Sequence, residues 1–317
     1  MRKTLIPLMM ALVLVLSACG NQQSSSTATN SAASNEESSS AGSDAATTIT
    51  YQSETGPVEV PAHPQRVIAL DSFAGDVMQF DVPLVGVDSW TMDSPVFKPY
   101  LDGVKQVSAD NLEQIIELKP DLIIASNTVK NADKLKQIAP LVTYTYNKVD
   151  YLTQIEEVAK ALNKADEGKA WVDDFKTRAS KAGDEIKAKI GADATVTVME
   201  GDTKSLYVFG DAWGRGTEII YQAMGLKMPE KVKEMTAKDG YYTLSLEVLP
   251  QYLGDYVFYS KAQDVDLSFQ NTDTYKNIPA VKNKHVYEAD ARGFYFNDAV
   301  TLDYQLDFIT KALLGQS

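Results

Sequence analysis

The sequence predicts an α/β protein of two Rossmann-like lobes joined by one long, rigid helix. In the first half, apolar runs of strand length alternate with helical patterns, which is typical of a parallel sheet with crossover helices. The second half repeats this plan, and a long amphipathic stretch separates the two. From residue 49 to residue 317 the chain is long enough for two lobes, each with its own core.

The first 18 residues are predicted to be a secretory signal peptide (residues 1–18). Arg2 and Lys3 precede an apolar run from Leu5 to Leu16, which is too short to span a bilayer. The run ends in Leu-Ser-Ala-Cys, which resembles a bacterial lipobox, so cleavage would leave Cys19 as a lipid-bearing amino terminus. Cys19 is the only cysteine, which excludes a disulfide, a thiolate metal site and a cysteine nucleophile.

Residues 19–48 are predicted to be the lipidated cysteine and a solvated tether. After Cys19 this segment contains no large apolar residue, and Ser, Ala, Thr and Asn dominate it. The formal net charge of the whole chain is -13, and the sequence contains no basic run. Nucleic acid is therefore not an expected partner.

The N-terminal lobe is assigned to residues 49–165. Its first pattern is a short hairpin that turns at Glu54-Thr55-Gly56, and a buried strand from Val67 to Leu70 follows. Strand-like and helical runs then alternate in the order PLVGVD, NLEQIIELKP, DLIIAS, NADKLKQIAP and LVTYTY. An amphipathic helix comes next, and we expect it to break near Asn163.

The connecting helix is assigned to residues 166–190. At about 1.5 Å per residue it would be roughly 37 Å long, which is enough for a strut between two lobes. Its apolar residues recur at spacings of three and four, as an amphipathic helix requires: Trp171, Phe175, Ala179, Ala182, Ile186 and Ile190.

The C-terminal lobe, residues 191–317, contains a partial repeat of the first. NLEQIIELKPDLIIAS (111–126) corresponds to SLEVLPQYLGDYVFYS (245–260). Each copy has a glutamate that we expect in the first turn of a helix, where an acidic residue is favourable for the helix dipole. The expected caps are Asn111 and Ser245. Four positions are identical: Leu112 and Leu246, Glu113 and Glu247, Asp121 and Asp255, Ser126 and Ser260.

These features together resemble the siderophore-binding lipoproteins of ABC iron importers. The resemblance is carried by the lipobox, the Ser-rich tether, HPQRVIAL, the two Leu-Glu segments, the long helix and above all GDAWGRG and GFYFND. It extends from Ile49 to the end and is strongest to Gram-positive receptors for ferric hydroxamates of the ferrichrome and ferrioxamine kind. It implies the class III periplasmic-binding-protein fold, in which two lobes on a rigid helix hold an iron chelate in a shallow cleft.

By this resemblance Trp213 and Arg215 are ligand residues. They lie where the strand YVFG ends, and ligands of open α/β sheets bind beyond the carboxyl ends of strands. Trp213 would offer a flat apolar face to the chelate, while Arg215 would donate hydrogen bonds to hydroxamate oxygens. A helix start disfavours arginine, so Arg215 must find an anion elsewhere. The alternative is that Trp213 packs under its loop and Arg215 pairs with Asp211 or Glu218.

Other rings are assigned to the same pocket. Tyr207 lies on the strand before the loop, Tyr146 ends LVTYTYN in the first lobe, and Tyr295 in GFYFND stands where relatives often have tryptophan. The substitution keeps a ring and adds a hydroxyl. Phe73 and Trp90 follow strand ends in the first lobe, so they are further candidates for the cleft.

No cofactor and no directly bound metal are expected. His63 and His285 are the only histidines, and neither lies near another ligand type at metal spacing, so both are interpreted as structural. The iron would arrive already chelated. Three hydroxamates cancel the charge of ferric iron, and one arginine suits such a near-neutral chelate. If Arg292 and Lys148 also face the cleft, a citrate-hydroxamate or a catecholate becomes an alternative.

Glu113 and Glu247 have a second interpretation besides the helix dipole. In the family such a pair, one per lobe, docks onto arginines of the two permease subunits. The implied partners are thus a ferric siderophore, an ABC permease with its cytoplasmic ATPase, and the membrane through the lipid on Cys19. The resemblance implies a monomer on the extracytoplasmic face of the cell membrane of a Gram-positive bacterium.

Three other functions are alternatives: binding of haem or a corrinoid, an enzyme activity, and a purely structural role. Haem or a corrinoid remains open as a ligand, since a tyrosine could ligate haem iron. An enzyme is not expected, because GDAWGRG lacks the lysine of a phosphate loop and the dinucleotide glycine spacing, and no serine lies in a nucleophile elbow. The loop that contains Trp213 and Arg215 disfavours a purely structural lipoprotein.

The rigid helix also predicts only a small movement of the lobes on ligand binding.

Overall fold

The computed structural model describes residues 47–316, so the predicted signal peptide, Cys19 and nearly all of the predicted tether lie outside the described residues. The described residues belong to one compact unit. The expected hairpin is present: β1 (Thr48–Ser53) pairs antiparallel with β2 (Gly56–Pro61). Gly56 ends the turn with a φ of 112°, which glycine adopts at little cost.

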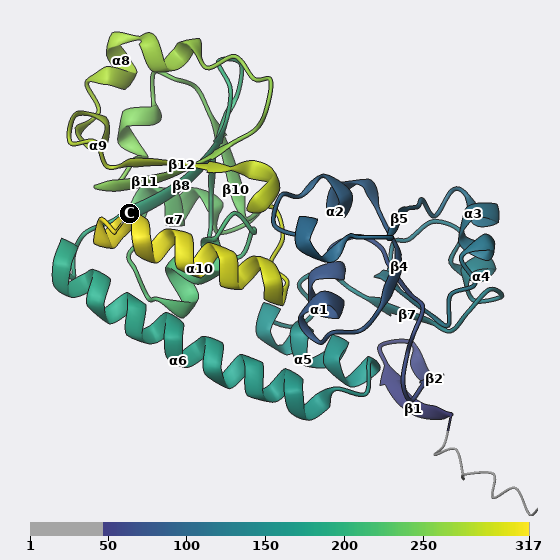
Figure 1. The fold of residues 1–317 in the computed structure, drawn as a ribbon. Coiled ribbons are helices and arrows are strands. Elements are labelled where there is room, and N and C mark those ends of the chain that lie inside the picture. Colours follow the sequence, from purple (N-terminus) through teal and green to yellow (C-terminus); the bar gives the residue numbers. More distant parts are fainter. Residues whose placement is uncertain (1–46, 317) are drawn as a thin grey trace, which may run out of the picture. The chain divides into compact units, whose positions relative to one another are not determined.

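The first lobe is built on a five-stranded parallel sheet with the order β5-β4-β3-β6-β7 (Figure 1). Its central strand is fully buried, as the apolar run predicted. The elements in chain order are β3 (Val67–Ala69), α1 (Ala74–Gln79), β4 (Leu84–Val87), α2 (Ser89–Asp93), η1 (Lys98–Tyr100), β5 (Lys105–Gln106), α3 (Leu112–Glu117), β6 (Leu122–Ser126), α4 (Ala132–Leu135) and β7 (Leu141–Tyr144).

The second lobe has a mixed sheet with the order β10-β9-β8-β11-β12, in which β9 runs antiparallel to both of its neighbours. The link between β8 and β9 is too short for a parallel crossover, so a hairpin replaces the expected repeat of the first lobe. Its elements are β8 (Val196–Gly201), β9 (Leu206–Phe209), η2 (Glu218–Ala223), α7 (Glu230–Thr236), β10 (Tyr241–Leu244), η3 (Leu249–Gln251), β11 (Tyr256–Lys261), η4 (Ser268–Asn271), α8 (Asp273–Lys276), α9 (Pro279–Lys282), β12 (Val286–Asp290), η5 (Ala291–Gly293) and α10 (Ala299–Leu314).

The internal repeat has a structural counterpart. Asp121 accepts hydrogen bonds from the backbone N–H groups of Gln65 and Arg66 at 2.7 and 2.9 Å, just before the central strand of the first lobe. Asp255 accepts one from Thr195 N at 2.8 Å, just before the central strand of the second lobe. Both aspartates therefore fix the entry of the chain into a central strand.

The repeated glutamates differ in their local structure. Asn111 caps α3 by accepting a hydrogen bond from Gln114 N at 3.2 Å, so Glu113 lies in the first turn of a helix as expected. For Glu247 the expectation is wrong, because this residue lies in a turn that precedes the short helix η3. Pro250 in that helix has no N–H to donate and so limits further helix formation.

Two helices connect the lobes along one side. α5 (Tyr151–Ala161) ends just before Asn163, which takes a left-handed φ of 58°, so the break is where it was expected. The connecting helix α6 (Ala165–Ile190) then runs for 26 residues and packs against α5 and α10 (Figure 1). Since α10 also packs against α1 of the first lobe, the closing helix ties both lobes together.

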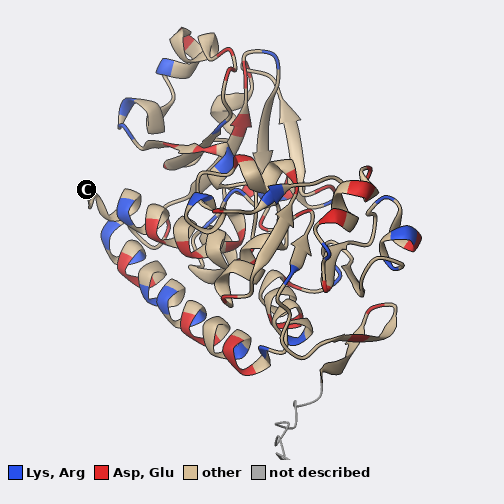
Figure 2. Ribbon diagram, turned by 45° about the vertical axis from the view of Figure 1, so that its right-hand side comes forward, with Lys and Arg blue, Asp and Glu red and all other residues tan. Residues whose placement is uncertain are grey.

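The position of α6 beside both lobes is explained by its two sides, one buried in the core and one exposed to solvent. One apolar core is continuous through both lobes, and within it Trp171 stacks on Phe175 with ring centroids 5.0 Å apart. Opposite charges alternate along the exposed side of α6 (Figure 2), as in the pairs Lys169–Asp173 and Arg178–Asp174. None of the described helices is long and apolar enough to cross a membrane.

Candidate functional site

Three cavities meet around Tyr146 and Asn147, in the loop that follows β7. A small one of about 80 Å³ is lined by both residues. A second, of about 300 Å³, shares Tyr146, and a third, of about 930 Å³, shares Asn147. Each cavity is lined by residues of both lobes, so together they form the candidate ligand cleft. This position, beyond the strand ends, is where open α/β sheets bind ligands.

The loop GDAWGRG has an unusual backbone. Gly214, Arg215 and Gly216 all adopt left-handed φ values, of 66°, 57° and 83°. Such a run is unfavourable for a side-chain-bearing residue, so the surroundings must hold it in place. The helix that was expected after the loop is present as the π-helix η2, a form that often occurs at functional sites.

Glu218, at the start of η2, holds this loop. Its side chain is buried, and one carboxylate oxygen accepts hydrogen bonds from Gly214 N at 2.9 Å and from Asn297 Nδ2 at 3.4 Å. The other oxygen accepts from Thr217 Oγ1 at 3.0 Å. Burial raises the pKa of Glu218, while the bond from Gly214 opposes the rise. The carboxylate therefore links the GDAWGRG loop to the GFYFND loop.

Arg215 finds its anion in Glu200, on β8. Its Nε lies 3.2 Å from one Glu200 oxygen, and its Nη2 lies 3.4 Å from the other. Neither Asp211 nor Glu218, the alternative partners, pairs with it among the described contacts. The guanidinium also lies over the rings of Phe209 and Tyr295, at 5.1 and 4.9 Å from their centroids, which is a cation–π geometry.

Trp213 lines the largest cavity and packs against the start of β10. Its ring centroid lies 5.1 Å from that of Tyr241, which in turn lies 6.4 Å from that of Tyr207. A Cβ on Gly240 would come within 2.5 Å of the Trp213 ring. The indole is therefore half-buried against the backbone of Gly240, with room in front of it on the cavity side.

The first lobe contributes rings to the other two cavities. Trp90 and Tyr146 are 62% and 60% exposed although both are large and aromatic, and both line the 300 Å³ cavity. Tyr295 of the second lobe joins them, with its ring 5.3 Å from that of Trp90 in an edge-on contact. Phe73 is buried; it packs on Tyr144 at 5.2 Å and lines the smallest cavity.

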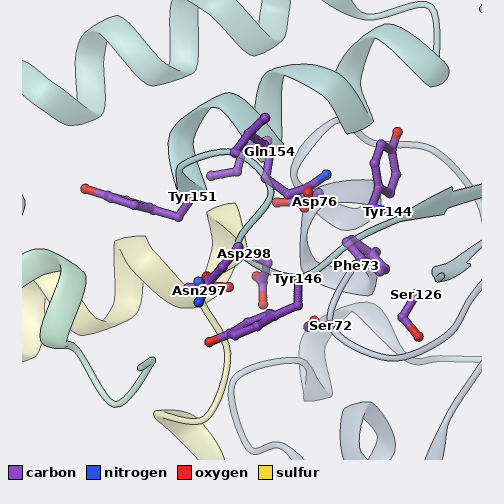
Figure 3. A pocket seen from close by; sticks show the side chains of 13 residues that line it. Ser72, Phe73, Asp76, Ser126, Tyr144, Tyr146, Tyr151, Gln154, Asn297 and Asp298 are labelled. Atoms are coloured by element: carbon purple, nitrogen blue, oxygen red, sulfur yellow. The ribbon is translucent and has the colours of Figure 1, made fainter. Parts of the chain in front are cut away.

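A pair of buried acids lies on the floor of the cleft (Figure 3). Asp76 of α1 and Asp298, the cap of α10, are each only 2% exposed and both line the smallest cavity. Asp76 accepts a hydrogen bond from Ala299 N at 2.8 Å. Burial raises the pKa of Asp76 well above its usual range, and the carboxylate of Asp298 adds to the rise. Burial also raises the pKa of Asp298, to about 6.

Other predicted residues lie away from the cavities. Arg215, Tyr207 and Arg292 line none of the three. Arg215 lies over the rings of Phe209 and Tyr295, whereas the Nε of Arg292 lies 3.7 Å from Asp290. Lys148 pairs with Glu54 at 3.2 Å instead of facing the cleft. His285 stacks on Tyr256, with ring centroids 4.3 Å apart, which is a structural role.

Within residues 47–316 no group of three or more His, Cys, Asp and Glu residues could hold a metal ion. Glu113 and Glu247 are both exposed and line none of the three cavities. They are thus free to face a partner rather than the ligand.

Sequence reasoning missed several residues of the cleft. Asp71 and Asp88 line the 300 Å³ cavity; Asp88 directly follows β4, and Asp71 lies two residues after β3. The strand-end rule that selected Phe73 and Trp90 would also have selected them. Tyr241 carried no such signal, because it begins an antiparallel strand whose pairing with β9 is visible only in the structure.

Comparisons with known proteins agree with this geometry. A family profile described as "Periplasmic binding protein" matches residues 76–292. The iron(3+)-hydroxamate-binding protein FhuD of Bacillus subtilis is 36% identical over 310 residues, which cover 95% of this chain and 94% of that protein. The iron(3+)-hydroxamate-binding protein YxeB of the same organism is 36% identical over 84% of this chain and 86% of its own length. The structure of FhuD2 from Staphylococcus aureus with bound ferrioxamine B has a TM-score of 0.75 at 34% identity and covers 80% of this chain and 99% of that one.

Proposed function

Since this chain belongs to the periplasmic binding protein family, we propose that it captures ferric hydroxamate siderophores outside the cell and delivers them to an ABC permease for iron uptake. The family consists of substrate-binding proteins and not of enzymes. The two Bacillus relatives bind iron(3+)-hydroxamates, and their likeness covers most of the chain. That likeness supports the same ligand class here.

The observation that carries the proposal is the environment of Arg215. Its three hydrogen bonds, to Glu200 and to Trp213 O, use three of the five guanidinium N–H groups, which leaves two without an acceptor among the described residues. Tyr295 lies against the guanidinium and Trp213 precedes it by two residues. The ring faces can pack against the apolar linkers of a chelate, and the free N–H groups can donate hydrogen bonds to its oxygens. This combination suits a ferric hydroxamate.

The distribution of basic residues supports a chelate that is not strongly anionic. A tris-catecholate would need several unpaired cations in the cleft, whereas Arg292 and Lys148 both lie beside acidic residues outside the three cavities. The largest cavity has three lysines in its lining, but it also has three acidic residues. Arg215 is itself paired with Glu200. The alternatives of a citrate-hydroxamate or a catecholate therefore gain no support from these contacts.

Delivery is proposed to use the two exposed glutamates. Glu113 and Glu247 occupy corresponding places in the two sheets, each before the fourth strand in sheet order, so they would meet two permease subunits in related ways. The lipid proposed on Cys19 would hold the monomer at the extracytoplasmic face of the cell membrane. No resident cofactor is proposed, since the iron enters and leaves with its siderophore.

Quenching of tryptophan fluorescence tests the ligand. The purified protein would be titrated with ferrioxamine B, ferrichrome, a ferric citrate-hydroxamate, a ferric catecholate and haem. We expect saturable quenching at submicromolar concentration by the two trihydroxamates alone, because Trp213 and Trp90 line the cleft. Quenching by only the anionic chelates or haem would overturn the hydroxamate assignment, and no quenching by any of them would overturn the proposed function.

A further inference from the structure

The part of the cleft that faces the first lobe has an excess of acidic side chains. Asp71 and Asp88 line the 300 Å³ cavity, and Asp76 and Asp298 line the smaller cavity that adjoins it. No lysine or arginine lines either cavity among the described residues. By contrast, the largest cavity, beside Trp213, has three lysines and three acidic residues in its lining. The acidic excess is therefore confined to one side of the cleft.

The two outer carboxylates are positioned but not neutralised. Asp71 accepts a hydrogen bond from Ser126 N at 2.7 Å, and Asp88 accepts one from Thr91 N at 2.9 Å, so the backbone orients both side chains. No ion pair within residues 47–316 includes either of them. Asp71 is exposed and Asp88 is half-buried, so both can meet a ligand that enters the cavity.

The floor beneath them contains a further acceptor. Asp76 is 2% exposed, and only one of its carboxylate oxygens accepts a hydrogen bond, from Ala299 N; the other has no donor among the described residues. The cavity that it lines shares Ser72, Tyr146 and Asn297 with the larger one (Figure 3). A buried carboxylate requires a proton or a cation nearby. Burial raises the pKa of Asp76, and a cationic group in the adjoining cavity would favour its charged form.

Aromatic rings surround the same space. Trp90, Tyr146 and Tyr295 line the 300 Å³ cavity, and the first two are mostly exposed in the absence of a ligand. The negative face of an aromatic ring attracts an ammonium group, and rings combined with carboxylates are a recurrent way to bind one. A neutral apolar arm would contact the rings, but it would leave Asp71 and Asp88 without a partner of opposite charge.

We propose that this cavity, lined by Trp90, Tyr146 and Tyr295 and bearing Asp71 and Asp88, binds a cationic arm of the ferric hydroxamate, such as a terminal primary ammonium. This inference rests on the proposed function, because the arm belongs to the chelate that Arg215 and Trp213 hold. The two lobes then have opposite roles in hydrogen bonding. The second lobe donates hydrogen bonds to the chelate oxygens, and the first lobe accepts hydrogen bonds from the ammonium group. Linear trihydroxamates with a free amine are the preferred class.

Two ligands that differ only in the arm test this. Ferrioxamine B has a terminal ammonium, and N-acetylation makes that arm neutral without changing the three hydroxamates. Affinities of the full protein for both ferric complexes would be measured by fluorescence quenching at low and high salt. We expect the ammonium form to bind about five- to tenfold more tightly at low salt, and we expect the difference to shrink at high salt.

The double variant Asp71→Asn, Asp88→Asn removes the two charges. Asparagine tolerates the left-handed φ of 62° at Asp71 and can keep the cap at Asp88, so the fold is expected to persist. The preference for the ammonium form over the acetylated form should fall to nearly one. Asp81→Asn is the matched control, since Asp81 is also exposed, has a φ of 53° and lies outside the three cavities.

The results of these titrations distinguish a failure of the ammonium site from a failure of the proposed function. Equal affinities in the unmodified protein, a preference that survives the double variant, or an equal loss in Asp81→Asn would overturn the ammonium site and leave the proposed function standing. Binding of neither complex would overturn both.

Discussion

Asp76 accepts a hydrogen bond from the backbone N–H of Ala299 at 2.8 Å, and this single bond joins α1 of the first lobe to the first turn of α10. The partners are 223 residues apart in sequence. Next to them Asp298 caps α10, so two carboxylates are buried together at a junction of the lobes. A small rearrangement at this point would move one lobe relative to the other.

The buried acids predict a pH dependence of stability. Burial raises the pKa of Asp76 and of Asp298, the latter to about 6, so between pH 4 and 6 the native state binds more protons than the unfolded state. The free energy of unfolding therefore falls as pH rises through this window. Asp76→Asn keeps an acceptor for Ala299, and its stability relative to the unmodified protein should increase as pH rises from 4 to 7.

Urea denaturation at several pH values would measure this difference. Asp133→Asn, at a side chain that is 99% exposed, serves as the control and should show no such trend. A difference between Asp76→Asn and the unmodified protein that does not change with pH would contradict the prediction.

Gly240→Ala should displace Trp213. The new Cβ would lie 2.5 Å from the indole, and the φ of 75° adds strain of about 1–2 kcal/mol. We expect a shifted tryptophan emission and at least tenfold weaker chelate binding. Gly103→Ala has the same backbone strain, with a φ of 76°, but no atom within 4 Å of the new Cβ. It should lose similar stability while keeping the emission spectrum and the affinity; equal affinities in the two variants would show that Trp213 does not contribute to binding.

Arg215→Ala should weaken chelate binding by about tenfold or more, because it removes the free N–H donors beside the rings. Its effect on folding should be modest, since the ion pair with Glu200 is partly exposed. Calorimetric titration and thermal melting would separate the two effects. Arg178→Ala, on α6, removes two ion pairs outside the three cavities and should leave affinity unchanged. Full affinity in Arg215→Ala would remove this residue from the site.

Glu218→Gln and Glu218→Ala should differ in chelate affinity. Glutamine can still accept the hydrogen bond from Gly214 N, whereas alanine leaves the GDAWGRG loop without its link to Asn297. We expect about threefold weaker binding for Gln and more than tenfold for Ala, by fluorescence titration. If both variants bind alike, the loops do not depend on the carboxylate.

Charge reversal at Glu113 or Glu247 should separate capture from delivery. Either change to lysine is expected to leave chelate affinity unchanged, because both side chains lie outside the three cavities. Uptake of ⁵⁵Fe-labelled chelate by cells should fall strongly, since like charges would meet at the permease. Glu185→Lys, on the exposed side of α6, is the control and should support normal uptake. Loss of chelate binding in either reversal would contradict the docking assignment.

Most of the elements could be predicted from the sequence alone, and the resemblance to a family suggested the class of ligand. Apolar runs marked the central strands, spacings of three and four marked α6, and the break at Asn163 followed from local pattern. These features depend on side chains close in sequence, so periodicity suffices to predict them. The resemblance then placed Trp213 and Arg215 in a ligand-binding loop, and the comparisons confirmed the family.

The assembly of the cleft became visible only in the folded chain. Arg215 pairs with Glu200 on β8, Trp213 packs on Tyr241 of an antiparallel strand, and Asp71 meets Tyr295 in one cavity; each pair brings together separate segments. Likewise Asp76 and Ala299 lie close together because α10, which follows both sheets along the chain, packs against α1. Such contacts are set by strand order and helix packing across the whole chain, and no local pattern encodes them.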